Sequence, residues 1–278
     1  MSFDGQTIWI TGASSGIGAA LARAFAGQGA VLILSGRNQE ALDAVAGQCG
    51  EALVLPFETT DYAALPGLAE KAWEWRGAID GLVNNAGISQ RSLAVDSSFA
   101  VYQRIVDVDL LAPIALTQAV LPRMAARGSG RLAFVSSIAG KVGVPLRTAY
   151  CAAKFGLAGY ADALRAETAH LGLQVHTIYP GSIRTDVSRN ALTADGSRRG
   201  QSDSVIDNGI DPDKAAADML SAMLAGEREI VIAEGREREM GLLRRTPDAL
   251  LDQMAGMMAA GYAERMKAEG AKDGAEAG

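Results

Sequence analysis

A tyrosine and a lysine, Tyr150 and Lys154, lie four residues apart in the stretch Thr148 to His170, whose sequence predicts a helix. Four residues make about one helical turn, so both side chains project from the same face. A phenol with its usual pKa of about 10 is a poor proton donor at neutral pH, but a nearby ammonium favours the phenolate and lowers that pKa. The pair therefore suits general acid–base chemistry. Alone the spacing is a weak signal, because a core aromatic beside a surface lysine gives the same pattern.

A glycine-rich run, TGASSGIG, stands near the N-terminus between an apolar strand-like run and the apolar helical pattern of Ala19–Ala26. Strand, glycine turn and helix is the arrangement that brings backbone N–H groups and a helix N-terminus against a pyrophosphate. In this interpretation Gly12 permits the tight turn, Gly16 lets the backbone approach the ligand, and Gly18 allows the helix to pack closely on the strand.

Three further motifs follow along the chain, each directly after another strand-like run. The first is Asn84-Asn85-Ala86-Gly87. The second is Ser137, which precedes Tyr150 by thirteen positions (150 − 137). The third is Pro180-Gly181, which with Thr185 completes P-G-x-x-x-T. Each motif alone fits an ordinary turn or loop.

In this order and spacing the motifs resemble those of the short-chain dehydrogenase/reductase family of the Tyr-dependent type, from about Thr7 to Glu234. The resemblance implies hydride transfer between a nicotinamide cofactor and the carbonyl or alcohol carbon of a small-molecule substrate. It implies that Tyr150 exchanges the proton, that Ser137 binds the same oxygen, and that Lys154 lowers the Tyr150 pKa and holds the nicotinamide ribose. The cofactor-binding residues that it implies are Gly12, Ser14, Ser15, Gly16, Ile17, Gly18, Arg37, Glu58, Thr59, Asn85, Ala86, Gly87, Tyr150, Lys154, Pro180, Gly181, Ile183 and Thr185.

One catalytic position departs from the family pattern. Asp109 stands where the family has an Asn whose main-chain carbonyl holds a water leading to the lysine. A carbonyl survives any substitution, so that relay can persist in this chain. The added carboxylate can also pair with Lys154 and weaken its effect on Tyr150.

The residues after the second strand predict NADP(H) in preference to NAD(H). Gly36 occupies the family's place for the Asp that binds the ribose hydroxyls, and Arg37 follows it. A guanidinium suits a 2′-phosphate, because it carries a permanent charge and several donors. Ser15 stands where many NADP-dependent members have a second basic residue, and Glu58 replaces the Asp that faces the adenine, with the backbone N–H of Thr59 next to it.

Alternating apolar runs and helical patterns predict the elements that position these motifs. Strands are predicted at Thr7–Ile10, Ala30–Ser35, Ala52–Leu55, Gly81–Val83, Arg131–Ser136, Leu173–Tyr179 and Glu229–Ala233. Helices are predicted at Ile17–Gly27, Gln39–Ala46, Tyr62–Arg76, Ser97–Arg127, Ala149–Leu171 and Asp213–Ala225. This is an α/β chain with a Rossmann-type, doubly wound, seven-stranded parallel sheet and helices on both faces. We expect one domain over residues 1–234 and a helical extension over residues 235–278.

The amino-acid composition limits which kinds of binding partner and which compartment we expect. A net charge of −6 and a pI of about 5.1 argue against nucleic acid, which is bound mainly by Lys and Arg. Cys49 and Cys151 show no metal or redox spacing, and His170 and His176 are too few for a histidine metal site. We therefore expect no metal, free thiols and a reducing, cytoplasmic compartment. No signal segment opens the sequence, and the apolar stretch 110–121 is too short to span a bilayer.

The C-terminal extension predicts an amphipathic helix, because apolar residues recur every four positions at Leu250, Met254, Met258, Tyr262 and Met266. The helix is expected to pack on the domain or another subunit, with peripheral contact to a membrane surface or a place at the substrate entrance as alternatives. Gly270–Gly278 is predicted to be disordered. Together with residues 190–197, the extension resembles the member 7-like branch of dehydrogenase/reductase proteins. This resemblance favours lipid-like or other bulky apolar ketones as substrates.

The substrate site itself is less defined by the sequence. Four residues, Ile138, Val142, Leu146 and Cys151, are expected near the reacting carbon, beneath a polar lid at Ser182–Asn208. Arginines 184, 189, 198 and 199 either bind an anionic group of the substrate or are solvated surface charges.

Two other functions stay open beside an NADP(H)-dependent carbonyl reductase or alcohol dehydrogenase. One is an NAD(H)-linked 3-oxoacyl reductase or alcohol dehydrogenase, and the other is a non-catalytic protein that senses NADP. The family resemblance also implies a homodimer or homotetramer formed through the long helices, and the apolar stretch 110–121 is compatible with it.

Overall fold

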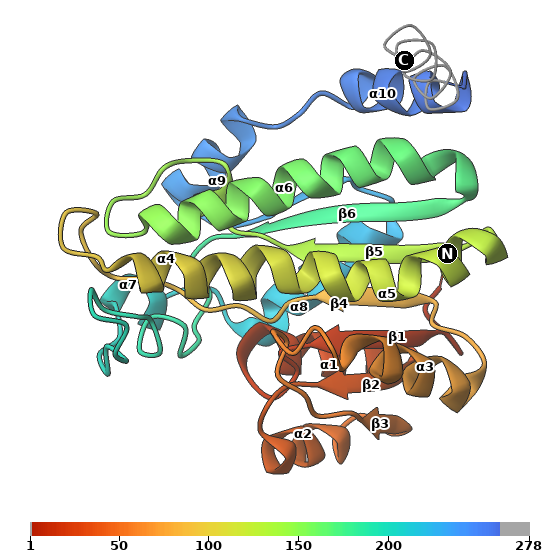
Figure 1. The fold of residues 1–278 in the computed structure, drawn as a ribbon, viewed down its shortest axis with the longest axis horizontal. Coiled ribbons are helices and arrows are strands. Elements are labelled where there is room, and N and C mark those ends of the chain that lie inside the picture. The colour runs from red at the N-terminus through yellow and green to blue at the C-terminus, as the bar shows by residue number, and fades with distance from the viewer. Residues whose placement is uncertain (1, 262–278) are drawn as a thin grey trace, which may run out of the picture.

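The computed structural model describes residues 2–261 and places them around one sheet of seven parallel strands (Figure 1). The strands are β1 (Thr7–Thr11), β2 (Val31–Ser35), β3 (Ala52–Val54), β4 (Gly81–Asn84), β5 (Gly130–Val135), β6 (Leu173–Pro180) and β7 (Glu229–Ile232). Their spatial order is β3-β2-β1-β4-β5-β6-β7, so the order reverses between β1 and β4. In such sheets a ligand binds beyond the carboxyl ends of the strands at the reversal, on the left-hand side of Figure 1.

Helices cover both faces of the sheet. One face carries α1 (Gly16–Gly27), α2 (Gln39–Ala46) and α8 (Pro212–Leu224), and the other carries α3 (Leu65–Arg76), α5 (Ala112–Arg127) and α6 (Thr148–Thr168). The remaining helical segments are α4 (Phe99–Val106), a π-helical turn (Asp107–Leu111), two 3₁₀ turns (Ile138–Gly140 and Ala169–Leu171), α7 (Ser204–Asp207), α9 (Gly235–Leu243) and α10 (Asp248–Ala259). The predicted doubly wound fold is confirmed.

The strands are apolar on both faces because both faces are covered. In β1, Ile8 and Ile10 belong to the core beneath α1 and α8, whereas Trp9 between them belongs to the core beneath α3, α5 and α6. All three side chains are almost fully buried. This is why the strands appear in the sequence as continuous apolar runs and not as alternating patterns.

The first turn of α3 differs from its prediction. The helix begins at Leu65 and not at Tyr62, with Pro66 in its first turn. Residues before it form a turn instead, in which the N–H of Ala64 donates to the carbonyl of Asp61. Proline is tolerated at a helix start because it lacks the N–H that would be unpaired there anyway.

The helical stretch Phe99–Arg127 runs without a break through α4, the π-helical turn and α5. By length and composition it would reach across a membrane, and it is the one helix between residues 2 and 261 that does. That test is weak, because core helices of soluble proteins also meet it. Leu116, Val120 and Met124 of this stretch are buried in the core, and the absence of a membrane span stays a prediction.

The C-terminal extension forms two helices, α9 and α10, and α10 packs on α6. The predicted apolar stripe is not buried within this chain: Leu250 and Met254 are exposed, whereas Leu251 beside them is buried. Packing of the stripe on another subunit or on a membrane surface stays a prediction. Asp252 of the same helix forms an ion pair with Arg228, the residue before β7. Tyr262, Met266 and Gly270–Gly278 lie outside the described residues.

Candidate active site

A cavity of about 540 Å³, part of it open to solvent, lies beyond the carboxyl ends of β1, β4, β5 and β6. Its walls bring together eleven of the predicted site residues: Ile17, Asn85, Gly87, Asp109, Ser137, Tyr150, Lys154, Pro180, Gly181, Ile183 and Thr185. These residues come from six separate segments that are as far apart in the chain as Ile17 and Thr185. The order of the strands therefore brings together, around one cavity, residues that are far apart in the sequence.

The glycine turn after β1 is tightly packed against the loop after β4. A Cβ added at Gly18 would overlap the carbonyl of Gly12, and Gly12 itself has a φ of +66°. The side chain of Asn85 donates to the carbonyls of Thr11 and Gly12 at 3.0 and 3.3 Å. This turn has space only for backbone, as a pyrophosphate cradle requires.

Thr11 is a positioning residue that the sequence reasoning did not include among the site residues. Its hydroxyl accepts the N–H groups of Asn85 at 3.0 Å and Ala86 at 3.1 Å, while it lies 3.4 Å from the carbonyl of Val83. It thereby ties the ends of β1 and β4 together at the strand-order reversal. The signal was available, because Thr11 is the polar residue that closes the first apolar run.

The serine after β5, Ser137, is held close to α6, the helix that carries Tyr150 and Lys154. The Ser137 hydroxyl caps the following 3₁₀ turn by accepting the Ala139 N–H at 3.1 Å, and its own proton faces the carbonyl of Pro180 at 3.5 Å. The neighbouring Ser136 donates to the carbonyl of Lys154 at 3.0 Å. A side chain at Gly140 would collide with this junction, because an added Cβ would lie 2.9 Å from that same carbonyl. Glycine is thus required for the serine loop to touch α6.

Lys154 is buried between Asp109 and Tyr150. Its ammonium lies 3.3 Å from an oxygen of Asp109, donates to the carbonyl of Val135 at 3.0 Å, and is 5.6 Å from the centre of the Tyr150 ring. Burial acts to lower the pKa of Lys154, but the charge of Asp109, followed by that of Tyr150, outweighs it and raises that pKa. The lysine is therefore held in its charged form.

Asp109 lies fully buried in the π-helical turn between α4 and α5. One carboxylate oxygen accepts the N–H of Ile88 at 2.8 Å, and the other faces Lys154. Burial raises the pKa of Asp109, and Lys154 and the Ile88 N–H act against that rise. The predicted pairing of Asp109 with Lys154 is thus present, and it places a negative charge beside the ammonium that is expected to act on Tyr150.

Asp109→Asn is expected to change the pH profile of catalysis in two ways. Removal of the carboxylate leaves the Lys154 charge uncompensated, so the limb of alcohol oxidation that rises with pH should move to lower pH. Without Asp109, burial lowers the pKa of Lys154 and only the charge of Tyr150 acts against it, so a decline should appear at high pH where the ammonium is lost. Initial rates between pH 5 and 11 test both effects. Asp107→Asn, in the same turn, is the matched control, and identical profiles for all three proteins would contradict the expectation.

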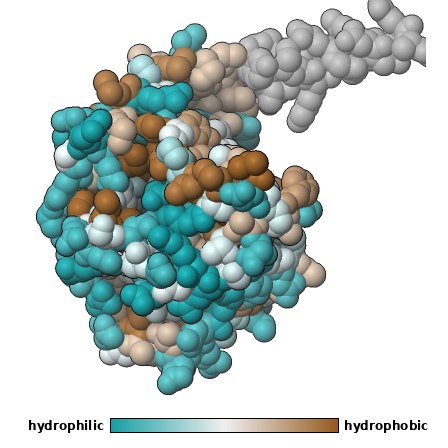
Figure 2. Space-filling view, turned by 90° about the vertical axis from the view of Figure 1, so that its left-hand side faces the viewer, coloured by the Kyte–Doolittle hydropathy of each residue, from teal (hydrophilic) through white to brown (hydrophobic). Residues whose placement is uncertain are grey.

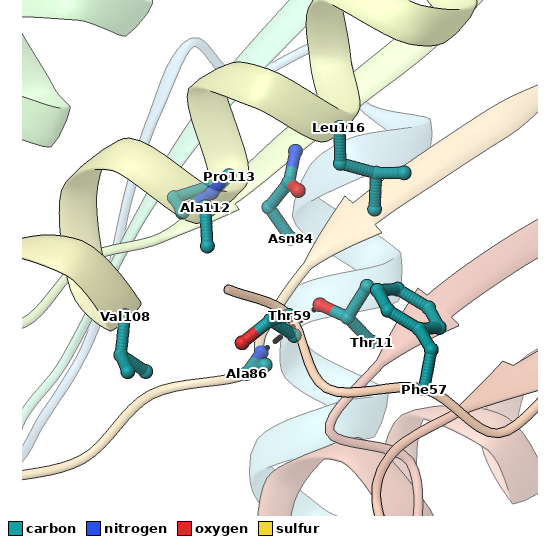
Figure 3. Close-up of a pocket in the computed structure, with 9 residues that line it drawn as sticks. All are labelled: Thr11, Phe57, Thr59, Asn84, Ala86, Val108, Ala112, Pro113 and Leu116. Carbon is teal, nitrogen blue, oxygen red and sulfur yellow. Dashed lines mark hydrogen bonds between the residues drawn. The ribbon is translucent and has the colours of Figure 1, made fainter. Parts of the chain in front are cut away.

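A smaller pocket, of about 230 Å³, lies beside the glycine turn and contains the predicted residues Thr59 and Ala86 (Figure 3). Phe57 and Thr59 follow β3 on one side, and Val108 and residues of α5 close the other. Its lining combines apolar side chains with the polar residues Thr11, Thr59 and Asn84.

The residues that were expected to choose the cofactor lie at the end of β2. A Cβ on Gly36 would lie 3.4 Å from the Ser14 hydroxyl, an ordinary van der Waals contact. Arg37 is exposed and lies 3.6 Å from a carboxylate oxygen of Glu58, which also lies 3.4 Å from Arg104. Burial acts to raise the pKa of Glu58, but Arg104 and then Arg37 outweigh it, so the pKa is lowered and the carboxylate is charged.

Four residues expected near the reacting carbon do not line the cavity. Ile138 is buried beneath α9, Cys151 is buried with its thiol against the backbone of Val144, and Leu146 is exposed with a φ of +66°. Val142 is also absent from the walls. The 3₁₀ turn after Ser137 places Ile138 beneath α9, and apolar walls of the cavity come from residues such as Ile88, Val187 and Ile206. Two of those lie in the predicted lid.

The lid arginines also stay outside the cavity walls. Arg184 pairs with Asp211, Arg189 with Asp186 and Arg199 with Asp203, all at the surface or partly exposed. Asp203 further pairs with Arg91 and Arg147, so ion pairs hold the lid against the loops after β4 and β5. In this conformation Arg184, Arg189 and Arg199 form ion pairs with aspartates of the chain.

The reversal in strand order, the pyrophosphate-type turn and the converging Ser137, Tyr150 and Lys154 define a nucleotide-binding oxidoreductase. The chain belongs to the short-chain dehydrogenase family, whose model, described as short chain dehydrogenase, matches residues 6–196. The family uses NAD(P) and acts on CH–OH and C=O groups, so the chain is a dehydrogenase/reductase.

Its relatives agree with that assignment. Dehydrogenase/reductase SDR family member 7B of Danio rerio is 37% identical over 238 residues, which are 82% of this chain and 77% of the relative. The protein of the same name from Bos taurus is 39% identical over 235 residues, 81% and 72% of the two chains. Among solved structures, a short-chain dehydrogenase from Streptomyces avermitilis superposes with a TM-score of 0.76 at 26% identity and covers 95% of this chain and 99% of its own.

Proposed function

We propose that the chain is an NADP(H)-dependent oxidoreductase that interconverts a bulky apolar ketone and its secondary alcohol, with Tyr150 as the general acid–base. The observation that carries the proposal is the convergence of Ser137, Tyr150 and Lys154 on one cavity that continues to the glycine turn. The residues present fit a dinucleotide, because the turn at Gly12 and Gly18 has no space for side chains and α1 begins at Gly16 beside it.

The bound cofactor supplies or accepts the hydride. The chain then has to bind the substrate oxygen and move one proton. In reduction, the Tyr150 hydroxyl gives its proton to the oxygen, while the Ser137 hydroxyl donates a hydrogen bond that positions the same atom. In oxidation the proton moves the other way. Lys154 remains charged in its buried site and favours the phenolate that each turnover requires.

Arg37 supports NADP(H) as the preferred cofactor. Its guanidinium is 68% exposed at the end of β2, and the neighbouring Gly36 provides no carboxylate for the ribose hydroxyls. The Glu58 carboxylate beside Arg37 offsets part of its charge, so the preference that we propose is a moderate one.

Arg37→Ala is expected to weaken NADPH binding about tenfold and to change NADH binding less than twofold. One charge-assisted contact with a phosphate has this order of magnitude. Fluorescence titration with each cofactor measures both values. Arg76→Ala, which removes another exposed arginine paired with a glutamate, is the control. Equal NADPH and NADH affinities in the unaltered protein would contradict the preference.

The substrate class is supported by the walls of the cavity and by the surface around it. Ile88, Val187 and Ile206 line the cavity with carbon. Further apolar side chains are exposed on the loops and helices at this end: Leu93, Val95, Phe99, Leu146 and Val205. Figure 2 faces this end and shows a band of apolar surface among hydrophilic side chains. Such a surface suits a substrate with a large apolar body.

NADPH oxidation with a panel of aldehydes, aliphatic and aromatic ketones, 3-oxoacyl thioesters and steroid ketones tests the proposal. Turnover of the bulky ketones, with little turnover of short aldehydes, is the expected result. Turnover of 3-oxoacyl thioesters with NADH would favour the alternative of an NAD-linked reductase. NADPH binding without turnover would favour a non-catalytic sensor, for which the Asp109–Lys154 pair is the supporting observation.

Assembly and compartment belong to the same proposal. We propose a homodimer or homotetramer through α5 and α6, supported by exposed Leu111 in the π-helical turn before α5 and exposed Phe155 in α6. We further propose a cytoplasmic enzyme, in keeping with two free cysteines, Cys49 and Cys151. Light scattering of the purified protein measures the number of subunits.

A further inference from the structure

The loop that follows β6 is tied to a carboxylate of the C-terminal extension. Glu237 of α9 accepts the backbone N–H of Ser182 at 2.7 Å with one oxygen and the Ser182 hydroxyl at 2.9 Å with the other. Fifty-five residues separate the two partners. The family match ends at residue 196, so Glu237 lies beyond it.

Three more backbone groups of this loop are also bonded. The N–H of Gly181 donates to Ile232 at 2.9 Å, the carbonyl of Ser182 accepts from Ile210 at 2.9 Å, and the N–H of Arg184 donates to Ile210 at 2.9 Å. Ile183 stands between these anchored groups, is 2% exposed, and lines the cavity with Gly181. The position of Ile183 in the cavity wall therefore depends on the bonds on either side of it.

The helix that carries Glu237 also supports the catalytic serine. A side chain at Gly241 would collide with Ile138 and Val231, so α9 lies directly against the 3₁₀ turn that begins after Ser137. Gly181 is packed in the same way, since an added Cβ would meet Ala233 at 2.8 Å and the Glu237 carboxylate. One short helix thus touches the segments on both sides of the nicotinamide end of the cavity.

From this geometry we infer that Glu237 is a positioning residue for the cofactor: it fixes the 181–184 loop so that the nicotinamide end meets a preformed wall. Glu237 is not among the residues that line the cavity and acts through Ser182. The inference deepens the proposed function and rests on the nicotinamide occupying the cavity at Tyr150. A loop that must be ordered by the ligand binds it more weakly than one already ordered.

Glu237→Ala should raise the Kd of NADPH and of NADH by the same factor, about tenfold, because the loop lies far from the 2′ position that distinguishes the two cofactors. The Kd of ADP-ribose and of its 2′-phosphate, which lack the nicotinamide, should stay within twofold of the value for the unaltered protein. Glu237→Gln should restore nicotinamide binding to within threefold, because its amide oxygen accepts the Ser182 N–H and its NH₂ donates to the Ser182 hydroxyl.

Fluorescence titration of the full chain gives the Kd of both reduced cofactors, and competition gives that of the two fragments. Glu239→Ala is the matched control, since it removes another carboxylate from α9 at an exposed position. The inference is overturned if Glu237→Ala binds both cofactors like the unaltered protein, if the fragments weaken as much as the cofactors, or if Glu237→Gln gives no recovery. An unaltered protein that binds neither cofactor would contradict the proposed function instead.

Discussion

Replacing Tyr150 with phenylalanine is expected to lower kcat/KM about a thousandfold while the Kd for NADPH changes less than threefold. The substitution removes one hydroxyl, which is the proposed proton donor. The ring remains and keeps its packing against the cluster of Val101, Ile105 and Ala153. Lys154 also keeps its bonds to Asp109 and to the Val135 carbonyl, so its charge stays in place.

Tyr160→Phe is the matched control for this prediction. It makes the same chemical change on the same helix, α6, but Tyr160 packs against Phe134 and does not line the cavity. Its kcat/KM should stay within a few-fold of the unaltered value. More than a tenth of the activity remaining in Tyr150→Phe would rule out this tyrosine as the general acid–base, whereas loss of NADPH binding would point to damage of the site.

Replacing Lys141 with methionine is expected to lower the free energy of unfolding by about 3–5 kcal/mol, because it strands a buried carboxylate. Lys141 and Glu229 are each 3% exposed, and their charged atoms lie 3.0 Å apart. Lys141 also donates to the carbonyl of Arg244 at 3.0 Å and lies 4.2 Å from the centre of the Tyr179 ring. Glu229 accepts the N–H of Thr246 at 2.8 Å. The pair therefore joins β7 to the segment that links α9 and α10.

Two variants separate the stranded charge from the loss of packing. The double variant Lys141→Met/Glu229→Leu buries no charge, and it should recover most of the lost stability in urea unfolding. Lys214→Ala breaks an exposed pair with Glu234, which solvent screens, and it should lower the free energy of unfolding far less than Lys141→Met does. If Lys141→Met costs no more than Lys214→Ala, the buried pair does not stabilise the fold as we expect.

Much of the fold and the centre of the site could be predicted because their signals are local. Each strand is a short apolar run closed by glycine or a polar residue, and alternation with helical patterns leaves a parallel sheet as the natural arrangement. The motif residues stand at the ends of these runs. Since parallel strands end at the same edge, residues as distant as Asn85, Ser137 and Thr185 were expected to meet, and they line one cavity.

The walls of the substrate site could not be predicted in the same way. Ile138 follows Ser137 directly, but the 3₁₀ turn directs it under α9, away from the cavity. Val187 and Ile206 reach the cavity from a lid whose course is set by ion pairs of Asp203 with three arginines, two of them outside the lid. Neither the direction of a short turn nor the course of an ion-paired loop follows from residue spacing.

The α/β class, the glycine turn and the order of the motif residues could thus be predicted from the sequence, because periodicity and turn chemistry act over a few neighbouring residues. Some contacts of charged residues could be read only from the folded structure, which places Glu58 between Arg37 and Arg104 and Glu237 on Ser182. The pairing of Asp109 with Lys154, by contrast, was expected from the sequence. The fold also buries Leu251, while Leu250 and Met254 of the predicted stripe stay exposed in this chain. These outcomes depend on how helices and loops approach one another in space, which long-range packing settles.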